Sequence, residues 1–329
     1  MRREPPPKLM LTIALMGSVA LSSATSAQAQ TAAWPHAAPI RIVTPTPVGV
    51  GSDPFTRMYG DFLGKALKAT VIVENRPGAA GTLGTDAVAK SAPNGYTLLI
   101  STSLPFTTAP SLLGKLPYHA QKDFVPVVQL YRGGSFVLAG PSFTGKTLQD
   151  LVAAAKKAPG SINYASYGPG STAHLGIELL QDAAGIEMAH IPYKQSAIPD
   201  LIGGQVTISW EPPVSALPNI RAGKVRALAY SGDKRSPSLP EVPTLAESYP
   251  GLEMFTWVGV WAPAGTPDAI VQRLQTAFAA ISKEPDMLRA LGDAGSEPMV
   301  TTQAQMAAAI EQETQAMSRL IKAKRITIN

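Results

Sequence analysis

The chain has 329 residues, with 28 Lys and Arg against 23 Asp and Glu, a net charge of +5, and no cysteine. The missing cysteine excludes disulfides, thiolate metal sites, a cysteine nucleophile and a lipid-carrying cysteine. Lys and Arg are scattered rather than clustered, which argues against nucleic acid as a partner.

The first 29 residues predict a secretory signal peptide. Residues 2–8 carry three basic side chains, residues 9–21 are uncharged and apolar, and residues 27–29 read Ala-Gln-Ala, a cleavage pattern. A membrane anchor is the alternative, but the apolar run is shorter than the ~20 residues that span a bilayer. Cleavage after residue 29 would leave 300 of the 329 residues, and we expect a soluble, monomeric periplasmic protein.

Short β-branched runs alternate with amphipathic helical windows, which predicts an α/β fold with mostly parallel sheets. Helices are expected to begin at Asp53-Pro54, Thr147, Thr266 and Thr302, each marked by a capping residue or proline. A mature chain of this length exceeds one core and predicts two lobes, residues 30–132 plus 248–329 and residues 133–247. The predicted strands are residues 40–44, 71–74, 96–101, 125–131, 135–139, 162–165, 189–192, 206–210, 225–230 and 256–261.

Three junctions between a predicted strand and a helix, residues 44–53, 164–174 and 192–200, are the candidates for a binding site. Each would lie at the carboxyl end of a strand, where ligands bind in open parallel sheets, with free backbone N–H groups at a helix N-terminus. Such groups suit an anion, and glycine permits close approach. We therefore expect a small carboxylate ligand that needs no Lys or Arg partner.

Ordered motifs along the whole mature chain resemble the Bug family, the extracytoplasmic solute receptors of tripartite tricarboxylate transporters. The resemblance implies a two-lobed, type II periplasmic binding protein of the Venus-flytrap kind with two crossovers. It also implies carboxylate binding through backbone amides and bridging waters, and delivery to membrane components. The motifs include Val73-Glu-Asn-Arg-Pro-Gly, Lys90-Ser-Ala-Pro-Asn-Gly-Tyr, Gly168-Pro-Gly-Ser-Thr-Ala-His, Asp200-Leu-Ile-Gly-Gly-Gln-Val and Ala262-Pro-Ala-Gly-Thr-Pro.

The family pattern also shows where this chain departs from it. The first loop differs at Thr46, Val48 and Val50, and the third is shorter by about two residues, so the ligand of a relative does not transfer safely. Asp53 is expected to cap a helix and order the first loop. The residues expected to contact the ligand are Thr46, Pro47, Val48, Gly49, Val50, Asp53, Ser101, Gly170, Ser171, Thr172, His174, Tyr193, Lys194, Ser196 and Trp210.

Two of these residues, Lys194 and Trp210, each have two possible interpretations. Lys194 either pairs with the ligand or stays solvated, Tyr193 is expected to form a cleft wall, and Trp210, followed by Glu211, either shapes the pocket or fills a core. The sequence does not decide whether the partner is a membrane permease or a sensor kinase.

Two other functions compete with the receptor. Residues 140–147 match the Walker A pattern, although Pro141 removes one phosphate-binding amide. Ser171 and His174 are a conceivable nucleophile and base, but the surrounding residues lack the Gly-x-Ser-x-Gly elbow. The four histidines are far apart in sequence and predict no metal site. We expect no enzyme activity and no cofactor.

Overall fold

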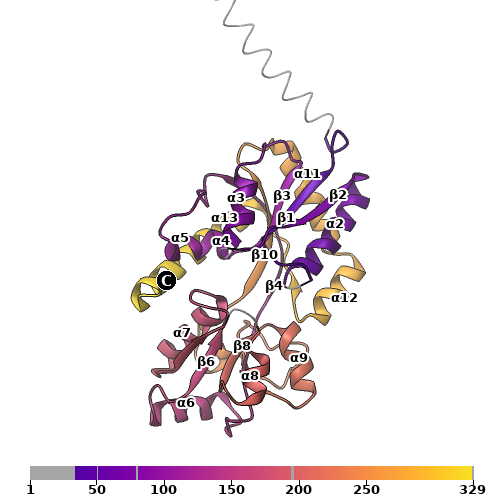
Figure 1. The fold of residues 1–329 in the computed structure, drawn as a ribbon. Helices are drawn as coiled ribbons and strands as arrows, with labels where there is room; N and C mark the ends of the chain where they lie inside the picture. Colours follow the sequence, from indigo (N-terminus) through magenta and orange to yellow (C-terminus); the bar gives the residue numbers. More distant parts are fainter. Residues whose placement is uncertain (1–33, 50, 79–80, 194–195, 328–329) are drawn as a thin grey trace, which may run out of the picture.

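A computed structural model of the chain describes residues 34–49, 51–78, 81–193 and 196–327. The predicted signal peptide, Val50 and Lys194 lie outside the described residues. Two sheets form the frame of two stacked halves (Figure 1). Among the described helices, none is both long enough and apolar enough to span a bilayer.

The first sheet has the strand order β11-β4-β10-β3-β1-β2 and combines strands from both ends of the chain. The second has the order β7-β6-β8-β5-β9 and comes from the middle of the chain. The chain passes from the first sheet to the second after β4 and returns before β10. The lobe limits near residues 132 and 248 stay predictions. The strands are β1 (Ile40–Thr44), β2 (Val71–Asn75), β3 (Thr97–Thr102), β4 (Phe124–Gly133), β5 (Phe136–Ala139), β6 (Asn163–Ser166), β7 (Ala189–Pro192), β8 (Ile208–Glu211), β9 (Arg226–Tyr230), β10 (Thr256–Pro263) and β11 (Glu297–Pro298).

The sheets are mixed, whereas the sequence predicted mostly parallel ones. β1 runs parallel to β2 and β3, and β6 runs parallel to β7 and β8, but β10 is antiparallel to β3 and β4, and β5 is antiparallel to β8 and β9. The antiparallel strands named here, β5 and β10, lie next to the passages between the two lobes. Because β5 enters the second lobe from the first, it must run against strands that end at the facing edge.

The helices begin close to where the sequence signals place them. Thr147 and Thr302 each close a capping box, while α2 has Ser52 at its N-cap and Asp53 as its first helical residue. The helices are α2 (Asp53–Leu67), α3 (Thr82–Ala89), α4 (Leu104–Thr107), α5 (Ala109–Leu112), α6 (Leu148–Lys157), α7 (Thr172–Ala184), α8 (Ile198–Gly203), α9 (Pro213–Arg221), α10 (Leu245–Ser248), α11 (Asp268–Ile281), α12 (Pro285–Asp293) and α13 (Gln303–Lys324).

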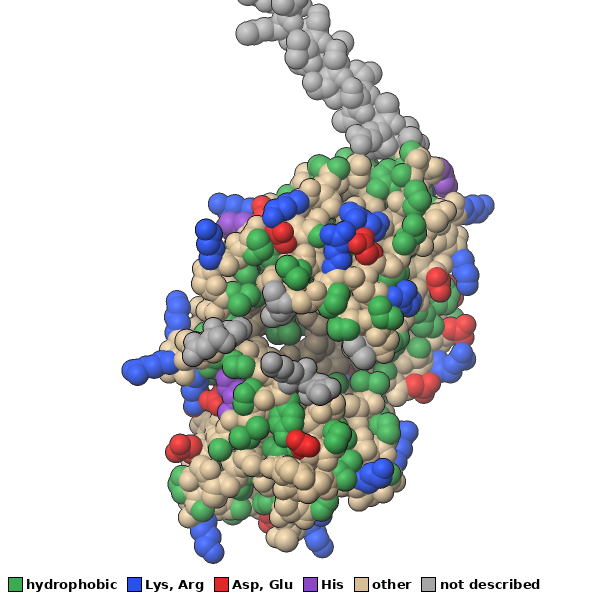
Figure 2. Space-filling view, viewed as in Figure 1, with side chains coloured by type: hydrophobic (Ala, Val, Ile, Leu, Met, Phe, Trp, Pro, Cys, Tyr) green, Lys and Arg blue, Asp and Glu red, His purple; other side chains and the backbone are tan. Residues whose placement is uncertain are grey.

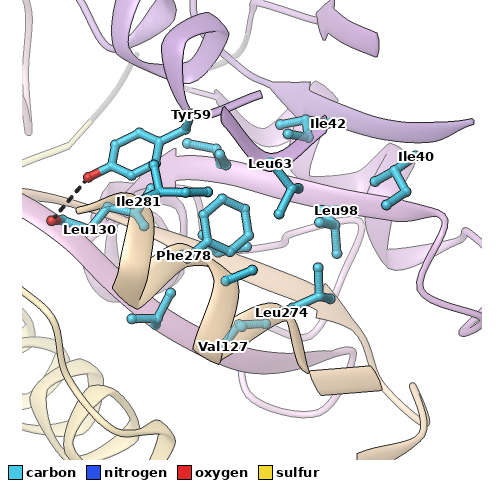
Figure 3. Close-up of a cluster of buried hydrophobic side chains, with 14 of the residues drawn as sticks. Ile40, Ile42, Tyr59, Leu63, Leu98, Val127, Leu130, Leu274, Phe278 and Ile281 are labelled. Atoms are coloured by element: carbon cyan, nitrogen blue, oxygen red, sulfur yellow. Dashed lines mark hydrogen bonds between the residues drawn. The ribbon is translucent and has the colours of Figure 1, made fainter. Parts of the chain in front are cut away.

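The core of the first lobe lies between its sheet and helices α2 and α11. Figure 3 shows Tyr59 and Leu63 of α2 meeting Phe278 of α11 over apolar strand residues such as Ile42. Each of these four side chains is fully buried. The Tyr59 hydroxyl remains hydrogen-bonded, at 3.0 Å from Ser282 Oγ and 3.5 Å from the Leu130 carbonyl oxygen. This packing holds α2 against the sheet and so fixes the position of the loop between β1 and α2.

The last turns of α13 bridge the two lobes, beside α7 in Figure 1. Leu320 and Ile321 of α13 pack in one buried cluster with Leu175 of α7. Lys324 forms ion pairs with Glu178, at 3.4 Å, and with Asp182. The C-terminal helix therefore contacts the helix that follows the second predicted binding loop.

Candidate ligand-binding site

The topology brings the carboxyl ends of the strands before the three predicted loops to one gap between the lobes. β4 ends and β10 begins at the passage to the second lobe, and β3 runs antiparallel to β10, so the ends of β1, β2 and β3 face that lobe. β5 starts at the passage, so the ends of β6, β7 and β8 face back. Figure 2 shows a hollow between the two halves.

The first loop, between β1 and α2, is organised around Asp53. The side chain is 1 % exposed, and its Oδ2 accepts hydrogen bonds from the Gly49 amide at 2.7 Å and Arg57 Nε at 3.1 Å. Its Oδ1 accepts one from Asn75 Nδ2 at 2.6 Å. Burial raises the pKa of Asp53, but the hydrogen bonds from Asn75, Gly49 and Arg57 outweigh it and leave the pKa below its usual range. Asp53 thus orders the loop, but the prediction that it caps the helix is wrong, because Ser52 is the N-cap and Asp53 is the first residue of α2.

The remaining residues of the first loop include one exposed apolar side chain. Thr46 Oγ1 lies 2.8 Å from Ser52 Oγ, and the Thr46 carbonyl oxygen accepts a hydrogen bond from Asn75. These bonds fix the backbone around Pro47. Val48 is 70 % exposed at the tip, which gives the loop an apolar surface.

The second loop, between β6 and α7, leaves two amides unused at the helix N-terminus. Ser171 is the N-cap, and its Oγ accepts from the His174 amide at 3.3 Å. The Gly170 amide donates to His174 Nδ1 at 3.0 Å. The amides of Thr172 and Ala173, the first two residues of α7, have no partner among the described residues. They carry the positive end of the helix dipole and suit an anion.

Two stacked histidines contact the second loop, and the sequence did not predict this arrangement. His174 and His190 stack with ring centroids 4.0 Å apart and planes 5° apart. His190 Nε2 lies 2.6 Å from Ser166 Oγ, which in turn accepts from the Gly168 amide at 3.0 Å. Burial, reinforced by the charge of His174, lowers the pKa of His190 to about 4, and burial also lowers the pKa of His174. Both rings are therefore held neutral.

The third loop, between β7 and α8, is hydrogen-bonded to the start of the second loop. The Tyr193 amide donates to the Ser166 carbonyl oxygen at 2.8 Å, and the Tyr193 hydroxyl donates to Asp200 at 2.8 Å. Ser196 Oγ accepts from the Ile198 amide at 3.3 Å. The Tyr193 hydroxyl is therefore bonded to α8, the helix that follows the loop, and only the ring is left to form a cleft wall.

Ser101 and Trp210, the two predicted contacts within strands, are both buried. Ser101 lies near the end of β3, is 0 % exposed, and its Oγ has no partner in the described part of the chain. Trp210 is 2 % exposed in the core of the second lobe, where its ring would meet any side chain at Gly176 of α7. Of its two interpretations, the structure therefore supports the core.

Glu211, next to Trp210 at the end of β8, forms a polar network that sequence reasoning did not find. The side chain is 1 % exposed. Its Oε2 accepts from the hydroxyls of Tyr167 at 2.6 Å and Ser215 at 2.9 Å, and its Oε1 accepts from Ser209 Oγ at 2.7 Å. Tyr167 belongs to the second loop and Ser215 to α9. Their separation in sequence hides this link, because no local pattern marks it.

The geometry of residues 140–147 does not suit phosphate. The amides of Lys146 and Thr147 both donate to Asp150 Oδ2, at 2.8 and 3.0 Å, so the groups that would cradle phosphate are occupied. Arg226 Nη1 donates to the carbonyl oxygens of Phe143 and Gly145. This segment follows β5, so it lies at the edge of the second sheet away from the gap.

Ser171 and His174 also lack the geometry of a nucleophile and base. The imidazole accepts from the Gly170 amide through Nδ1, and its Nε2 lies 3.9 Å from Glu178 Oε1. Ser171 Oγ contacts the His174 backbone rather than its ring. Across the described residues, no group of three or more His, Asp or Glu side chains is arranged to hold a metal ion.

Comparisons with known proteins identify the family to which the chain belongs. Residues 55–326 match the model of the tripartite tricarboxylate transporter family receptor. Protein BugT of Bordetella pertussis is 34 % identical over 314 residues, covering 94 % of this chain and 96 % of BugT. Rpa4515 of R. palustris with adipate has a TM-score of 0.81 at 30 % identity, covering 90 % of this chain and 100 % of that one. MatC of Rhodopseudomonas palustris with bound malate has a TM-score of 0.74 at 29 % identity, covering 86 % and 98 %. The chain belongs to the family of tripartite tricarboxylate transporter receptors.

Proposed function

We propose that this chain is a periplasmic solute receptor that captures a small organic carboxylate between its two lobes. The observation that carries the proposal is the pair of unused amides at Thr172 and Ala173, at the start of a helix that faces the gap. A carboxylate accepts hydrogen bonds from such amides and is stabilised by the helix dipole. Adipate and malate in the two related structures are ligands of this chemical class.

Closure of the lobes is the proposed functional event. A ligand held by both the first and second loops binds the closed form better than the open one, so it shifts the population toward closure. The ordered first loop, with Asp53 at its centre, supplies the opposing surface. Exclusion of water then strengthens each amide–carboxylate bond. A closed, loaded receptor is the form that a membrane permease or a sensor kinase would recognise.

Export is the remaining part of the proposal. The first 29 residues have the composition of a signal peptide, and the family is one of transporter receptors. We expect the mature chain to begin after residue 29 and to act without catalysis, as a monomer. Mass spectrometry of the protein recovered from the periplasm of an expressing bacterium would check the cleavage position.

The receptor function is tested by a thermal-shift screen of ligand-stripped protein against mono-, di- and tricarboxylates, amino acids, sugars and ATP. A bound ligand raises the melting temperature once its free concentration exceeds its dissociation constant. We expect a shift with at least one carboxylate. A shift with ATP or sugars and silence from every acid would contradict the proposal.

The variant Ser171→Leu tests the second loop directly. It removes the N-cap of α7 and places an apolar side chain beside the two unused amides, so carboxylate binding should be lost. The control is Thr147→Leu, which removes the N-cap of α6 at the far edge of the same lobe. Each loses about 1 kcal/mol of stability from its missing cap. Only the first should lose the ligand.

A further inference from the structure

The gap between the lobes has features that narrow the ligand class. We infer that the ligand carries a single carboxylate on an uncharged apolar body, that this body packs against Tyr167, and that Glu211 disfavours a second carboxylate. The inference rests on the proposed receptor function and deepens it. It is carried by the network around Glu211 together with the apolar side chains exposed at the two facing edges.

Glu211 is a buried carboxylate that has no cationic partner in the described part of the chain. It lies at the end of β8, on the edge of the second sheet that faces the first lobe. Its three hydrogen-bond donors are the neutral hydroxyls of Tyr167, Ser209 and Ser215. No Lys, Arg or His among the described residues lies within ion-pair distance of it. A carboxylate brought close to it would meet a second carboxyl group whose hydrogen-bond donors are already in use, which disfavours it.

The Tyr167 ring is the surface above this carboxylate. Tyr167 is 44 % exposed, although its hydroxyl donates to Glu211 at 2.6 Å. This bond to the end of β8 restrains the ring, which stays partly exposed. A ring held in place in this way loses little entropy when a ligand packs on it.

The opposite edge offers matching apolar surface. Val48, at the tip of the first loop, is 70 % exposed. The loop that carries Tyr167 approaches the first lobe closely, since a Cβ built on Gly170 would stand 2.0 Å from Leu112 Cδ1 of α5. Val48 and Tyr167 are thus exposed apolar side chains that the first and second loops offer to a ligand body. Apolar contact of this kind favours an aliphatic or aromatic body.

The cations near the two edges are already engaged. Arg57 pairs with Asp53, and Arg76 pairs with Glu74. Arg132, at the passage between the lobes, pairs with Asp233 and Glu297. Among the described groups near the two edges, the unused amides of α7 therefore remain available to an anion, whereas these arginines do not.

The experiment compares matched acids by isothermal titration of ligand-stripped protein. Hexanoate and adipate have the same carbon chain and differ by one carboxylate, and benzoate and terephthalate form a second such pair. We expect the monocarboxylate of at least one pair to bind at least about tenfold more tightly than its dicarboxylate. Equal or tighter binding of the dicarboxylate in both pairs would overturn the inference. Tighter binding of an amino acid than of any apolar acid would overturn it as well.

Substitutions at Glu211 and Tyr167 test which residues produce the preference for a monocarboxylate. Glu211→Gln should raise adipate affinity relative to hexanoate by about tenfold, because it removes the charge and keeps an acceptor for Tyr167. Glu241→Gln, an exposed acid of the same lobe, is the control and should leave the ratio unchanged. Tyr167→Ala should weaken the preferred monocarboxylate by about tenfold, and Tyr167→Phe should restore most of the loss. An unchanged ratio in Glu211→Gln would remove Glu211 from the selection.

The two proposals fail in different ways. If no acid of any kind binds the natural protein, the receptor function itself is wrong. If dicarboxylates bind as well as monocarboxylates, the receptor function stands and the inference about ligand class falls. The comparison uses the natural chain, so it decides the question even if a substitution at Glu211 disturbs folding.

Discussion

The stacked histidines under the second loop should make the protein lose stability in mild acid. The folded state keeps His190 neutral, with its pKa lowered to about 4 by burial and the neighbouring His174, whereas the unfolded chain takes up a proton near pH 6.5. The unfolded state therefore binds more protons between pH 6.5 and about 4. Stability must fall as the pH drops through that window and stay level above it.

The size of this effect follows from the two pKa values. Between pH 8 and pH 5, a pKa of about 4 in the folded state against 6.5 in the unfolded state corresponds to about 2 kcal/mol of lost stability. His190 is only partly buried, and solvent screening reduces the loss to about 1 kcal/mol. For a chain of this length, that loss lowers the melting temperature by roughly 2 °C. Carboxylates contribute little in this range, because most of their titration lies below pH 5.

The assay is urea denaturation at pH 8 and pH 5, for the natural chain and for His190→Gln. Glutamine cannot take up a proton but can still bond Ser166, so the variant should show a smaller difference between the two pH values. His36→Gln, at an exposed position, should behave as the natural chain does. Equal losses in the natural chain and in His190→Gln would refute the reasoning. Carboxylate affinity should stay unchanged between the two pH values, because the folded state keeps His190 neutral and the loop before the unused amides intact.

Three further changes test other parts of the site. Asp53→Asn should cost about 2–3 kcal/mol in urea denaturation, because its buried donors lose a charged acceptor. Gly170→Ala should weaken ligand binding in titration calorimetry by about tenfold, because the backbone has φ +76° and a Cβ would stand 2.0 Å from a leucine carbon of the first lobe. Gly160→Ala, with φ +73° and open space around it, is the control that shares only the backbone strain. Lys324→Met should cost about 0.5–1 kcal/mol in the same denaturation assay, because it breaks partly exposed ion pairs to α7, and a cost near zero would show that the apolar contacts alone join α13 to α7.

Local sequence signals predicted most of the fold. The capping residues Thr147 and Thr302 and the proline after Asp53 marked helix starts, and β-branched runs marked the strands. Strand direction was not accessible in the same way. β10 pairs with β3 and β4, strands more than 100 residues away, and no local pattern distinguishes such a partner from a parallel one.

The candidate site likewise has a part that local sequence predicts and a part that depends on contacts between distant residues. The unused amides at the start of α7 follow residues 168–174, a contiguous motif, so the sequence sufficed to locate them, and anion binding there stays a prediction. The stack of His174 on His190 and the bond from Tyr167 to Glu211 join residues 16 and 44 positions apart. These contacts depend on β6 lying beside β7 and β8, which only the folded chain reveals. For Trp210 the sequence left two interpretations open, because a tryptophan suits a pocket as well as a core.

The position of β10 has a consequence for the order in which the chain folds. β10 lies in the middle of the first sheet, between β3 and β4, yet it follows the whole second lobe in sequence. As the chain is made from its N-terminus, β4 has no sheet partner until residue 256 and beyond have been synthesised. The second lobe, by contrast, is continuous and can assemble first. A released chain that is truncated near residue 250 should therefore hold a protease-resistant second lobe attached to an unfinished, exposed β4.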